Sequence, residues 1–420
     1  MPLAGHVHKL TPVDSGPLAT GASTAPHLWL SQVSLRQFRN YESVRLDLAA
    51  KPILVVGQNG VGKTNLLEAL SLLVPGRGMR RARAEHLVRQ ADETGASAGQ
   101  NANAKVNAKV NVTMPWAVSA ILQGDGAPCQ IGTGVLADAE QPRRVMRLNG
   151  ETVTQSDIGA LISASWLTPQ MDGIFVDSPG ARRRFIDRLV IAFDPAHIGR
   201  TNKYEKMLRE RTVLLAEGRG DDYWFATLET RLAETAVAIT AARLSLIADL
   251  NIEAEKGWFG FPGARLDLTG DVETWLADMP ALAVEDKLAD AARQARLAGD
   301  RAMPGPHASE LGATHVQTGT PAVLASTGQQ KALLIAVILA HARLQHRRLG
   351  RAPLMLLDDV AAHLDVERRL ALFDAIGDLG AQSWFSGTDI DDFDGLRDQA
   401  QMIRITASGE DTRPPKVEVM

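Results

Sequence analysis

The sequence has few of the features that mark several large classes of protein. Its 420 residues contain a single cysteine, Cys129, which excludes an internal disulfide and a metal site built from several cysteines. It contains no apolar run of the ~20 residues needed to span a bilayer, and its first residues lack the charged start and apolar core of a secretion signal. A net charge of −4 argues against a wholly basic protein that coats nucleic acid. We therefore expect a globular, cytoplasmic protein, in which 45% apolar residues fill one large core and an accessory lobe.

A glycine-rich loop follows a short apolar run near the start of the chain. Residues 53–56 read as a buried strand, and the loop after them fits the pattern of a glycine, four residues and then Gly-Lys-Thr. Its glycines allow a tight turn, so that backbone N–H groups face a phosphate at the start of a helix expected over residues 65–73. The strand and the helix oppose the alternative of an ordinary glycine turn. The predicted ATP-binding residues here are Gly57, Gln58, Asn59, Gly60, Val61, Gly62, Lys63, Thr64 and Asn65, with Lys63 on the β- and γ-phosphates and Thr64 on Mg²⁺.

A second apolar run ends in two carboxylates. Residues 354–357 are typical of a central parallel strand, and Asp358 and Asp359 stand at its carboxyl end, where α/β sheets bind ligands. Asp358 is positioned to hold Mg²⁺, directly or through water, and Asp359 to act as the base that orients the attacking water. A strand end that happens to be acidic is the alternative, which the phosphate loop earlier in the chain disfavours. The two motifs predict an α/β fold of the phosphate-loop ATPase kind.

The segment at residues 325–331 indicates which kind of phosphate-loop protein this is. Ser326 or Thr327 can cap an apolar helix over residues 332–342, and Gly328 lets a phosphate approach the start of that helix. Taken alone the pattern is only a capped helix, but its place before the acidic strand makes it resemble the signature motif of ABC ATPases, with Ala325 in place of the usual leucine. This resemblance implies that Ser326, Gly328 and Gln329 reach ATP held by a second subunit, in a head-to-head dimer with two sandwiched nucleotides.

Residues 361–365 continue the comparison with ABC ATPases. Leu364 and Asp365 resemble the D-loop, which touches the partner subunit and places Asp365 near the nucleotide. His363, just before them, fits an interface or solvent residue better than a catalytic base.

The chain also shows how its parts are organised. Residues 204–217 and 222–255 have helical spacing on either side of a glycine break, which indicates an antiparallel helical lobe. At ~1.5 Å per residue the longer helix reaches only about 50 Å, so the long coiled-coil arms of SMC-type proteins are absent. The predicted organisation is a disordered extension (1–27), the first part of the ATPase lobe with an insertion at 91–111 (28–150), helical lobe II (151–300), a linker (301–320) and the second part of the ATPase lobe (321–420).

Several ordered motifs together are similar to those of the RecF family of SMC-like ABC ATPases. They are residues 35–41, the phosphate loop with Asn59, residues 178–187, residues 328–331 and residues 357–360, within a likeness that runs from about Trp29 to Ile405. The family resemblance implies a slow, DNA-dependent ATPase that dimerises on ATP and binds junctions of single- and double-stranded DNA at gaps. It also implies work with RecO and RecR in loading RecA, in recombinational repair and replication-fork restart. By the same resemblance Arg39 and Asn40 lie beside the nucleotide, where an ordinary surface arginine is the alternative for Arg39.

The chain departs from the family and from transporters at two places. Gln170 stands where RecF proteins usually carry an acidic residue; it is either a catalytic Q-loop glutamine that contacts Mg²⁺ and water or a plain loop residue. Ser386 and its neighbours stand where transporters place a switch histidine, which favours DNA repair.

Two groups of basic residues are candidates for DNA contact. One consists of Arg77, Arg80, Arg81 and Arg83, and the other extends from Arg182 to Arg211. Such a surface would hold DNA mainly through phosphates, although basic runs are more often solvated faces or paired between helices. The family resemblance favours the second group, and the predicted DNA-binding residues are Arg182, Arg183, Arg184, Arg188, Arg200, Lys203 and Lys206.

Two functions from different classes fit the sequence. The first is an ATP-gated DNA clamp whose hydrolysis times its release from DNA. The second is an ABC-type ATPase module coupled to a protein partner such as a transporter, which the Arg-rich helical lobe and the missing switch histidine disfavour. The side-by-side Asp358 and Asp359 oppose a third reading, in which ATP is only a structural ligand.

Overall fold

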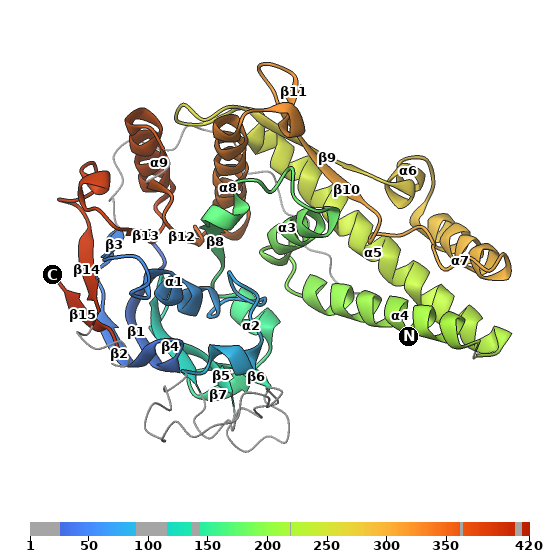
Figure 1. Cartoon of the computed structure of the whole chain (residues 1–420), viewed down its shortest axis with the longest axis horizontal. Helices are drawn as coiled ribbons and strands as arrows, with labels where there is room; N and C mark the ends of the chain where they lie inside the picture. The colour runs from blue at the N-terminus through green and yellow to red at the C-terminus, as the bar shows by residue number, and fades with distance from the viewer. Residues whose placement is uncertain (1–25, 90–115, 136–142, 219, 362–363, 408–413) are drawn as a thin grey trace, which may run out of the picture.

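The structure, a computed structural model, describes residues 26–89, 116–135, 143–218, 220–361, 364–407 and 414–420. It has a head that contains two large sheets and an elongated arm that is mostly helical (Figure 1). This confirms the predicted fold class, an ATPase head of the α/β type with a second, mainly helical lobe. The predicted insertion at 91–111, His363 and nearly all of the predicted N-terminal extension lie outside the described residues.

One sheet of the head is antiparallel. In spatial order its strands are β2 (Tyr41–Asp47), β1 (Trp29–Phe38), β4 (Ala117–Gln123), β5 (Cys129–Val135), β6 (Arg144–Leu148) and β7 (Glu151–Val153). The tight turn from β1 to β2 carries Arg39 and Asn40, so this sheet delivers both residues to the phosphate loop.

The other sheet of the head carries the ATPase motifs. In spatial order its strands are β15 (Lys416–Val419), β14 (Gln401–Thr406), β3 (Ile53–Val56), β13 (Ser383–Gly387), β12 (Leu354–Leu357) and β8 (Ala164–Leu167), all parallel to their neighbours except β15. Every residue of β3 and β12 is buried, as their continuous apolar runs predict. Because β3, β13 and β12 are parallel, the phosphate loop after β3 and the two carboxylates after β12 lie at the same edge of the sheet. Only β13 separates the two strands.

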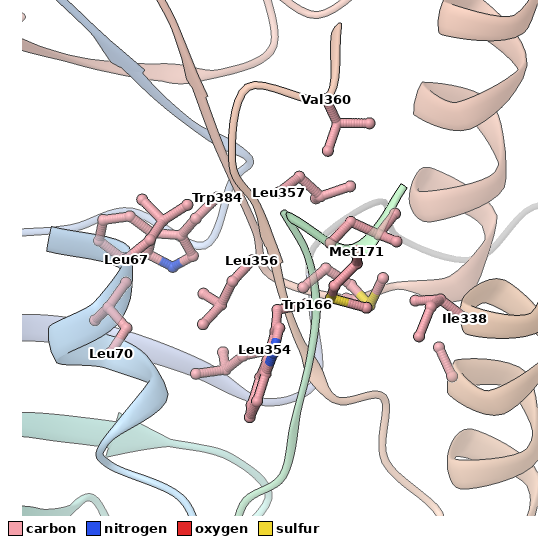
Figure 2. Packing of buried hydrophobic residues seen from close by; sticks show 14 of the residues in the cluster. Leu67, Leu70, Trp166, Met171, Ile338, Leu354, Leu356, Leu357, Val360 and Trp384 are labelled. Atoms are coloured by element: carbon pink, nitrogen blue, oxygen red, sulfur yellow. The ribbon is translucent and has the colours of Figure 1, made fainter. Parts of the chain in front are cut away.

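Helices cover both faces of this sheet. Leu67 and Leu70 of α1 (Lys63–Ser71) approach it from one side, and Ile338 of α8 (Thr327–Leu349) from the other, with Trp384 and Leu356 between them (Figure 2). A further helix, α9 (Val366–Leu379), packs beside α8. The apolar faces of these helices are therefore what fixes the orientation of the sheet edge that carries the motifs.

The arm is built around a helical hairpin. After α3 (Pro179–Ile191), it consists of α4 (His197–Glu217), α5 (Asp222–Ala254), α6 (Asp271–Asp278) and α7 (Ala281–Leu297). Helix α5 packs against α4, α7 and α8, so it is the spine that joins the arm to the head. The two predicted helices are confirmed, although α4 begins seven residues earlier than predicted, at His197. Among the described residues α5 is the one helix long and apolar enough to cross a membrane by length and composition, and half of that apolar stretch is buried within the protein.

Two predicted boundaries are corrected. Residues 301–320, expected as a linker, contain β10 (Glu310–His315), which pairs along its whole length with β9 (Ala264–Thr269) and at its end with β11 (Thr320–Pro321). In β10, half-buried and buried residues alternate over the first four positions, as is typical of a strand. The glycines and prolines around it led the sequence analysis to predict a linker instead. In addition, β8 lies in the ATPase sheet although the prediction assigned residues 151–300 to the helical lobe.

A buried ion pair fastens α4 to α5. Arg211, which the basic run had suggested for DNA, is 0% exposed; its Nε lies 3.1 Å from Glu229 Oε1 and its Nη2 donates to the Ala292 carbonyl at 2.8 Å. Replacing Glu229 by alanine leaves this guanidinium buried without a counter-charge, so we expect a loss of about 3–5 kcal/mol in the free energy of unfolding, measured by urea denaturation. The matched control is Glu234→Ala, an exposed residue of the same helix. Equal stability of the two variants would contradict this role.

Candidate ATP site

The phosphate loop has the shape that its glycines allow. Gly62 caps α1 with φ +115°, and a Cβ at this position would lie 2.4 Å from Asn40 Nδ2. A Cβ on Gly57 would lie 2.2 Å from the Ile405 carbonyl oxygen of the neighbouring strand. Lys63 is buried, and its ammonium donates to the carbonyls of Gly57 at 2.7 Å and Gln58 at 3.0 Å, so it is folded back over the loop. The loop thus offers a helix start and a cation at one point, as phosphate binding requires.

Asp358 and Thr64, which are 294 residues apart in sequence, meet at the sheet edge. Thr64 Oγ1 donates to Asp358 Oδ1 at 3.0 Å, and Ser386 Oγ donates to the same oxygen at 2.7 Å. Burial raises the pKa of Asp358, and the hydrogen bonds from Ser386 and Thr64 oppose that rise. A hydroxyl next to a buried carboxylate is a pair of hard oxygen donors, which fits the ligand preference of Mg²⁺.

Asp359 has an unusual backbone conformation. Its φ is +49°, in the left-handed region, and its N–H donates to Ser386 Oγ at 3.0 Å. Burial lowers the pKa of Lys63, and the charges of Asp359 and then Asp358 act against that shift. A strained backbone held in place by its surroundings is typical of functional positions.

Ser386 is a site residue whose contacts the sequence did not reveal. The sequence noted only that it stands where transporters carry a histidine. In the structure its hydroxyl joins the Asp358 side chain to the Asp359 backbone. The available signal was positional: Ser386 is the next-to-last residue of β13 and Asp358 directly follows β12, so both lie at the carboxyl ends of parallel strands.

The turn before β2 braces the phosphate loop. Asn40 Nδ2 donates to the Val61 carbonyl at 2.9 Å, and Asn40 Oδ1 accepts from Asn65 Nδ2 at 2.8 Å. The Tyr41 hydroxyl donates to the Gly62 carbonyl at 3.0 Å, a contact that the sequence did not predict. Asn40 and Asn65, both predicted to lie at the nucleotide, therefore belong to one hydrogen-bonded frame around the loop.

Arg39 pairs with a carboxylate of α1, and its role at the phosphates stays a prediction. Its Nε and Nη2 donate to the carboxylate of Glu68 at 2.9 and 2.8 Å, and its Nη1 donates to the His86 carbonyl at 3.0 Å. Glu68 is 1% exposed, so this bidentate pair is a strong, sheltered one. The Arg39 guanidinium, which was predicted to contact the phosphates, is bonded here to Glu68 of α1. A buried carboxylate among apolar neighbours requires such a partner.

The signature segment is an open helix start. Ser326 caps α8 by a capping box with Gln329, whose Oε1 accepts from the Ser326 N–H at 2.9 Å. Residues 326–329 are all exposed, and the nearest atom to a Cβ on Gly328 is Arg368 Nη1 at 4.0 Å. The predicted capped helix is confirmed. In the described part of the chain no hydrogen bond joins this segment to the phosphate loop of the same subunit.

Gln170 and Asp365 lie near these motifs, and their roles stay predictions. Gln170 is exposed in a short turn, η2 (Pro169–Met171), that follows β8, whose last residue Leu167 accepts the Asp358 N–H at 2.9 Å. The same turn is tied to α8 by Lys331 and Asp172 at 3.2 Å. Asp365 caps α9 by accepting the Arg368 N–H at 2.8 Å.

The predicted DNA-binding residues divide into three groups. Arg182 and Arg200 are paired with Glu310 and Asp194, and Arg183 donates to the Ser309 carbonyl at 2.9 Å. Arg188 is a correction: its guanidinium lies 4.7 Å from the Trp166 ring centroid, and burial lowers its pKa to about 9, because it stands on the face of α3 that packs on the head. The residues left exposed, with no ion pair inside the described ranges, are Arg184, Lys203 and Lys206.

Comparisons with known proteins show which family has this sequence and fold. The family model of the RecF/RecN/SMC N terminal domain matches residues 29–388. The chain is 40% identical to the DNA replication and repair protein RecF of Mesorhizobium japonicum, over 90% of this chain and 96% of the relative. It is also 40% identical to RecF of Agrobacterium fabrum, over 90% and 97%. A solved structure of the recombination mediator protein RecF with ATP, of the RecFOR pathway, shares the fold with a TM-score of 0.71 at 20% identity, over 94% of this chain and all of that one.

Proposed function

The chain belongs to the RecF family of DNA replication and repair proteins, and from this premise we propose that it is an ATP-gated DNA clamp of the RecFOR type. ATP closes a dimer of two heads on DNA, and slow hydrolysis of ATP to ADP and phosphate opens the dimer again. One observation carries the proposal above all others: the Thr64 and Asp358 side chains meet beside the phosphate loop, while the signature helix of the same subunit is open to solvent.

Each residue has a definite task in this proposal. The N–H groups of the loop and Lys63 bind the phosphates, and Thr64 and Asp358 would hold Mg²⁺, which supplies positive charge to the β- and γ-phosphate oxygens. Asp359 orients the attacking water and accepts its proton. Ser326, Gly328 and Gln329 of one subunit complete the site of the other, because a helix start stabilises the charge on a γ-phosphate.

DNA is the proposed partner of the arm. Arg184, Lys203 and Lys206 form an exposed basic surface at its root, and such a surface binds phosphates without reading bases. By family membership we propose junctions of single- and double-stranded DNA at gaps as the substrate. RecO and RecR are the proposed partners in loading RecA, in recombinational repair and in fork restart, in the cytoplasm.

The test follows ATP turnover and molecular mass together. The purified protein is assayed without DNA, with a plain duplex and with a gapped duplex, while light scattering reports its mass. We expect turnover to rise with DNA, most with the gapped duplex, and ATP to shift the protein from monomer to dimer. Turnover that ignores DNA, or a protein that stays monomeric with ATP, would favour an ATPase module coupled to a protein partner.

A further inference from the structure

A second cavity lies at the root of the arm, apart from the ATP site. It has a volume of about 180 Å³ and is enclosed by α3, α4, α5 and the loop before β10. The polar residues of its wall include Arg183, Arg184, Tyr204, Glu205, Arg243 and His307. The eleven lining residues contain three arginines and two carboxylates, Asp187 and Glu205, and none of them belongs to the phosphate loop.

Part of the wall is held rigidly. Arg243 is buried; it donates to both carboxylate oxygens of Asp187 at 2.8 and 2.9 Å and to the Pro306 carbonyl at 2.7 Å. The Tyr204 hydroxyl lies 2.7 Å from His307 Nδ1. The positive charge of Arg243 is therefore already balanced by Asp187, and these residues form a frame whose shape does not depend on a ligand.

The remaining arginines have spare donors. Arg183 uses its Nη1 for the Ser309 carbonyl, and Arg184 has no ion pair or hydrogen bond within the described ranges. Arg184 lies over the first turn of α3: a Cβ on Gly180 would be 3.0 Å from Arg184 Nη1. Glu205 is the one wall carboxylate not bonded to the frame, and it lies 3.8 Å from Arg209. The cavity thus gathers unbalanced positive charge beside a helix start, which favours an anion.

A neighbouring segment of the head contacts the arm next to this cavity. Arg81 in this segment has φ +54° and is exposed as a residue; partial desolvation of its guanidinium, and then the charges of Arg184 and Arg77, lower its pKa, while Glu205 and Asp187 act against that shift. Arg77 Nη2 approaches Asn202 Oδ1 of α4 at 3.5 Å, so the segment contacts the arm directly.

The residue before Arg81 faces the ATP site instead. Arg80 Nη1 donates to Asn65 Oδ1 at 2.8 Å and lies 3.6 Å from Glu68. Asn65 in turn donates a hydrogen bond to Asn40, and Asn40 donates one to the carbonyl of Val61 in the phosphate loop. The segment from Arg77 to Arg81 therefore contacts both the arm beside the cavity and the frame that holds the phosphate loop.

We propose that this cavity binds one phosphate group, held by Arg184 and Arg183, and that the segment from Arg77 to Arg81, which contacts both α4 and Asn65, couples its occupancy to the phosphate loop. The phosphate is that of a DNA backbone, with free inorganic phosphate as the other source of the same chemistry. The inference rests on the proposed function, which it deepens by naming where DNA acts on the ATPase.

The test compares Arg184→Gln and Arg81→Gln with Arg231→Gln, which removes the same charge from an exposed position of α5 outside the cavity. Binding to a gapped duplex is measured over a range of salt concentrations, together with the ratio of ATP turnover with and without saturating DNA. For Arg184→Gln we expect about tenfold weaker binding and a salt slope reduced by about one. For Arg184→Gln and Arg81→Gln, we expect the increase in ATP turnover caused by DNA to fall to about one-tenth of the wild-type increase. The increase for Arg231→Gln should stay near that of the wild type. Gly180→Ala, which displaces the Arg184 guanidinium, reproduces the loss in part.

A second arm titrates inorganic phosphate by calorimetry. One outcome is that Arg184→Gln abolishes phosphate binding but leaves the affinity for DNA unchanged. This result supports the phosphate site and overturns the proposal that its phosphate comes from DNA. Cavity variants that behave like Arg231→Gln in both arms overturn the site itself. The proposed function is tested separately with the wild-type protein. If DNA raises the ATP turnover of the wild type, the proposed function stands even when the cavity variants behave like the wild type.

Discussion

Replacing Lys63 by methionine is expected to abolish ATP binding. The substitution keeps the apolar stem but removes the ammonium that donates to the loop carbonyls of Gly57 and Gln58 and that interacts electrostatically with Asp359 and Asp358. Without it, a polyphosphate meets two carboxylates with no fixed cation between them. The lost charge-assisted contacts are worth about 3–4 kcal/mol, so affinity falls by roughly 100- to 1,000-fold.

The measurement is titration with a fluorescent ATP analogue or calorimetry. The matched control is Lys51→Met, an exposed lysine just before β3, which should bind ATP as the wild type does. A Lys63→Met protein that bound ATP within threefold of the control would show that the loop N–H groups alone carry the affinity.

The same variant can reveal whether the signature helix acts across subunits. Lys63→Met and Gly328→Asp proteins are each expected to be inactive, because every site of either dimer lacks one half. Mixed in equal amounts, they form heterodimers with one complete site, and turnover should recover to roughly a quarter of wild type. No recovery from a mixture that dimerises would place the signature outside the ATP site.

Replacing Asp359 by asparagine is expected to leave ATP binding intact and to trap the dimer. Asparagine has nearly the same shape and tolerates the left-handed conformation that φ +49° requires, so the backbone bond to Ser386 survives. It cannot accept a proton from water, and the loss of a general base lowers turnover by roughly 10²- to 10⁴-fold. The dimer then persists because ATP is not consumed.

Single-turnover hydrolysis and light scattering with ATP test this. Asp394→Asn, an exposed carboxylate outside the site, serves as the control. Normal hydrolysis by the Asp359→Asn protein would refute its assignment as the base, and the exposed Gln170 would become the next candidate for positioning water.

The parts that the sequence predicts well are those whose chemistry lies within a few consecutive residues. The phosphate loop, the acidic strand and the cap of α8 each combine a local conformation with side chains in fixed order, so Gly62, Asp358 and Ser326 could be found without knowing any neighbour. The partners of Arg39 and Arg188 could not, because Glu68 and Trp166 come from other elements. The direction of a charged side chain depends on which face of its helix packs, and composition does not contain that information.

The linker prediction failed for a related reason. Glycine and proline around β10 indicate irregular structure on average, but strand β9, some forty residues earlier, offers an edge whose hydrogen bonds need a partner. Six residues of β10 satisfy that edge in full register. Pairing energy from a distant segment therefore overrides a local preference for loops.

The order of strands in the ATPase sheet has a consequence for the growing chain. Thr64 emerges from the ribosome 294 residues before its partner Asp358, which at bacterial speeds of about 5–20 residues per second is a delay of roughly 15–60 s. During that time strands β12 and β13, which separate β8 from β3, do not yet exist, so the phosphate loop stands at the edge of an unfinished sheet. Asp358 and Ser386, which hydrogen-bond to each other and, through Asp358, to Thr64, therefore join the phosphate loop only when most of the chain has been made.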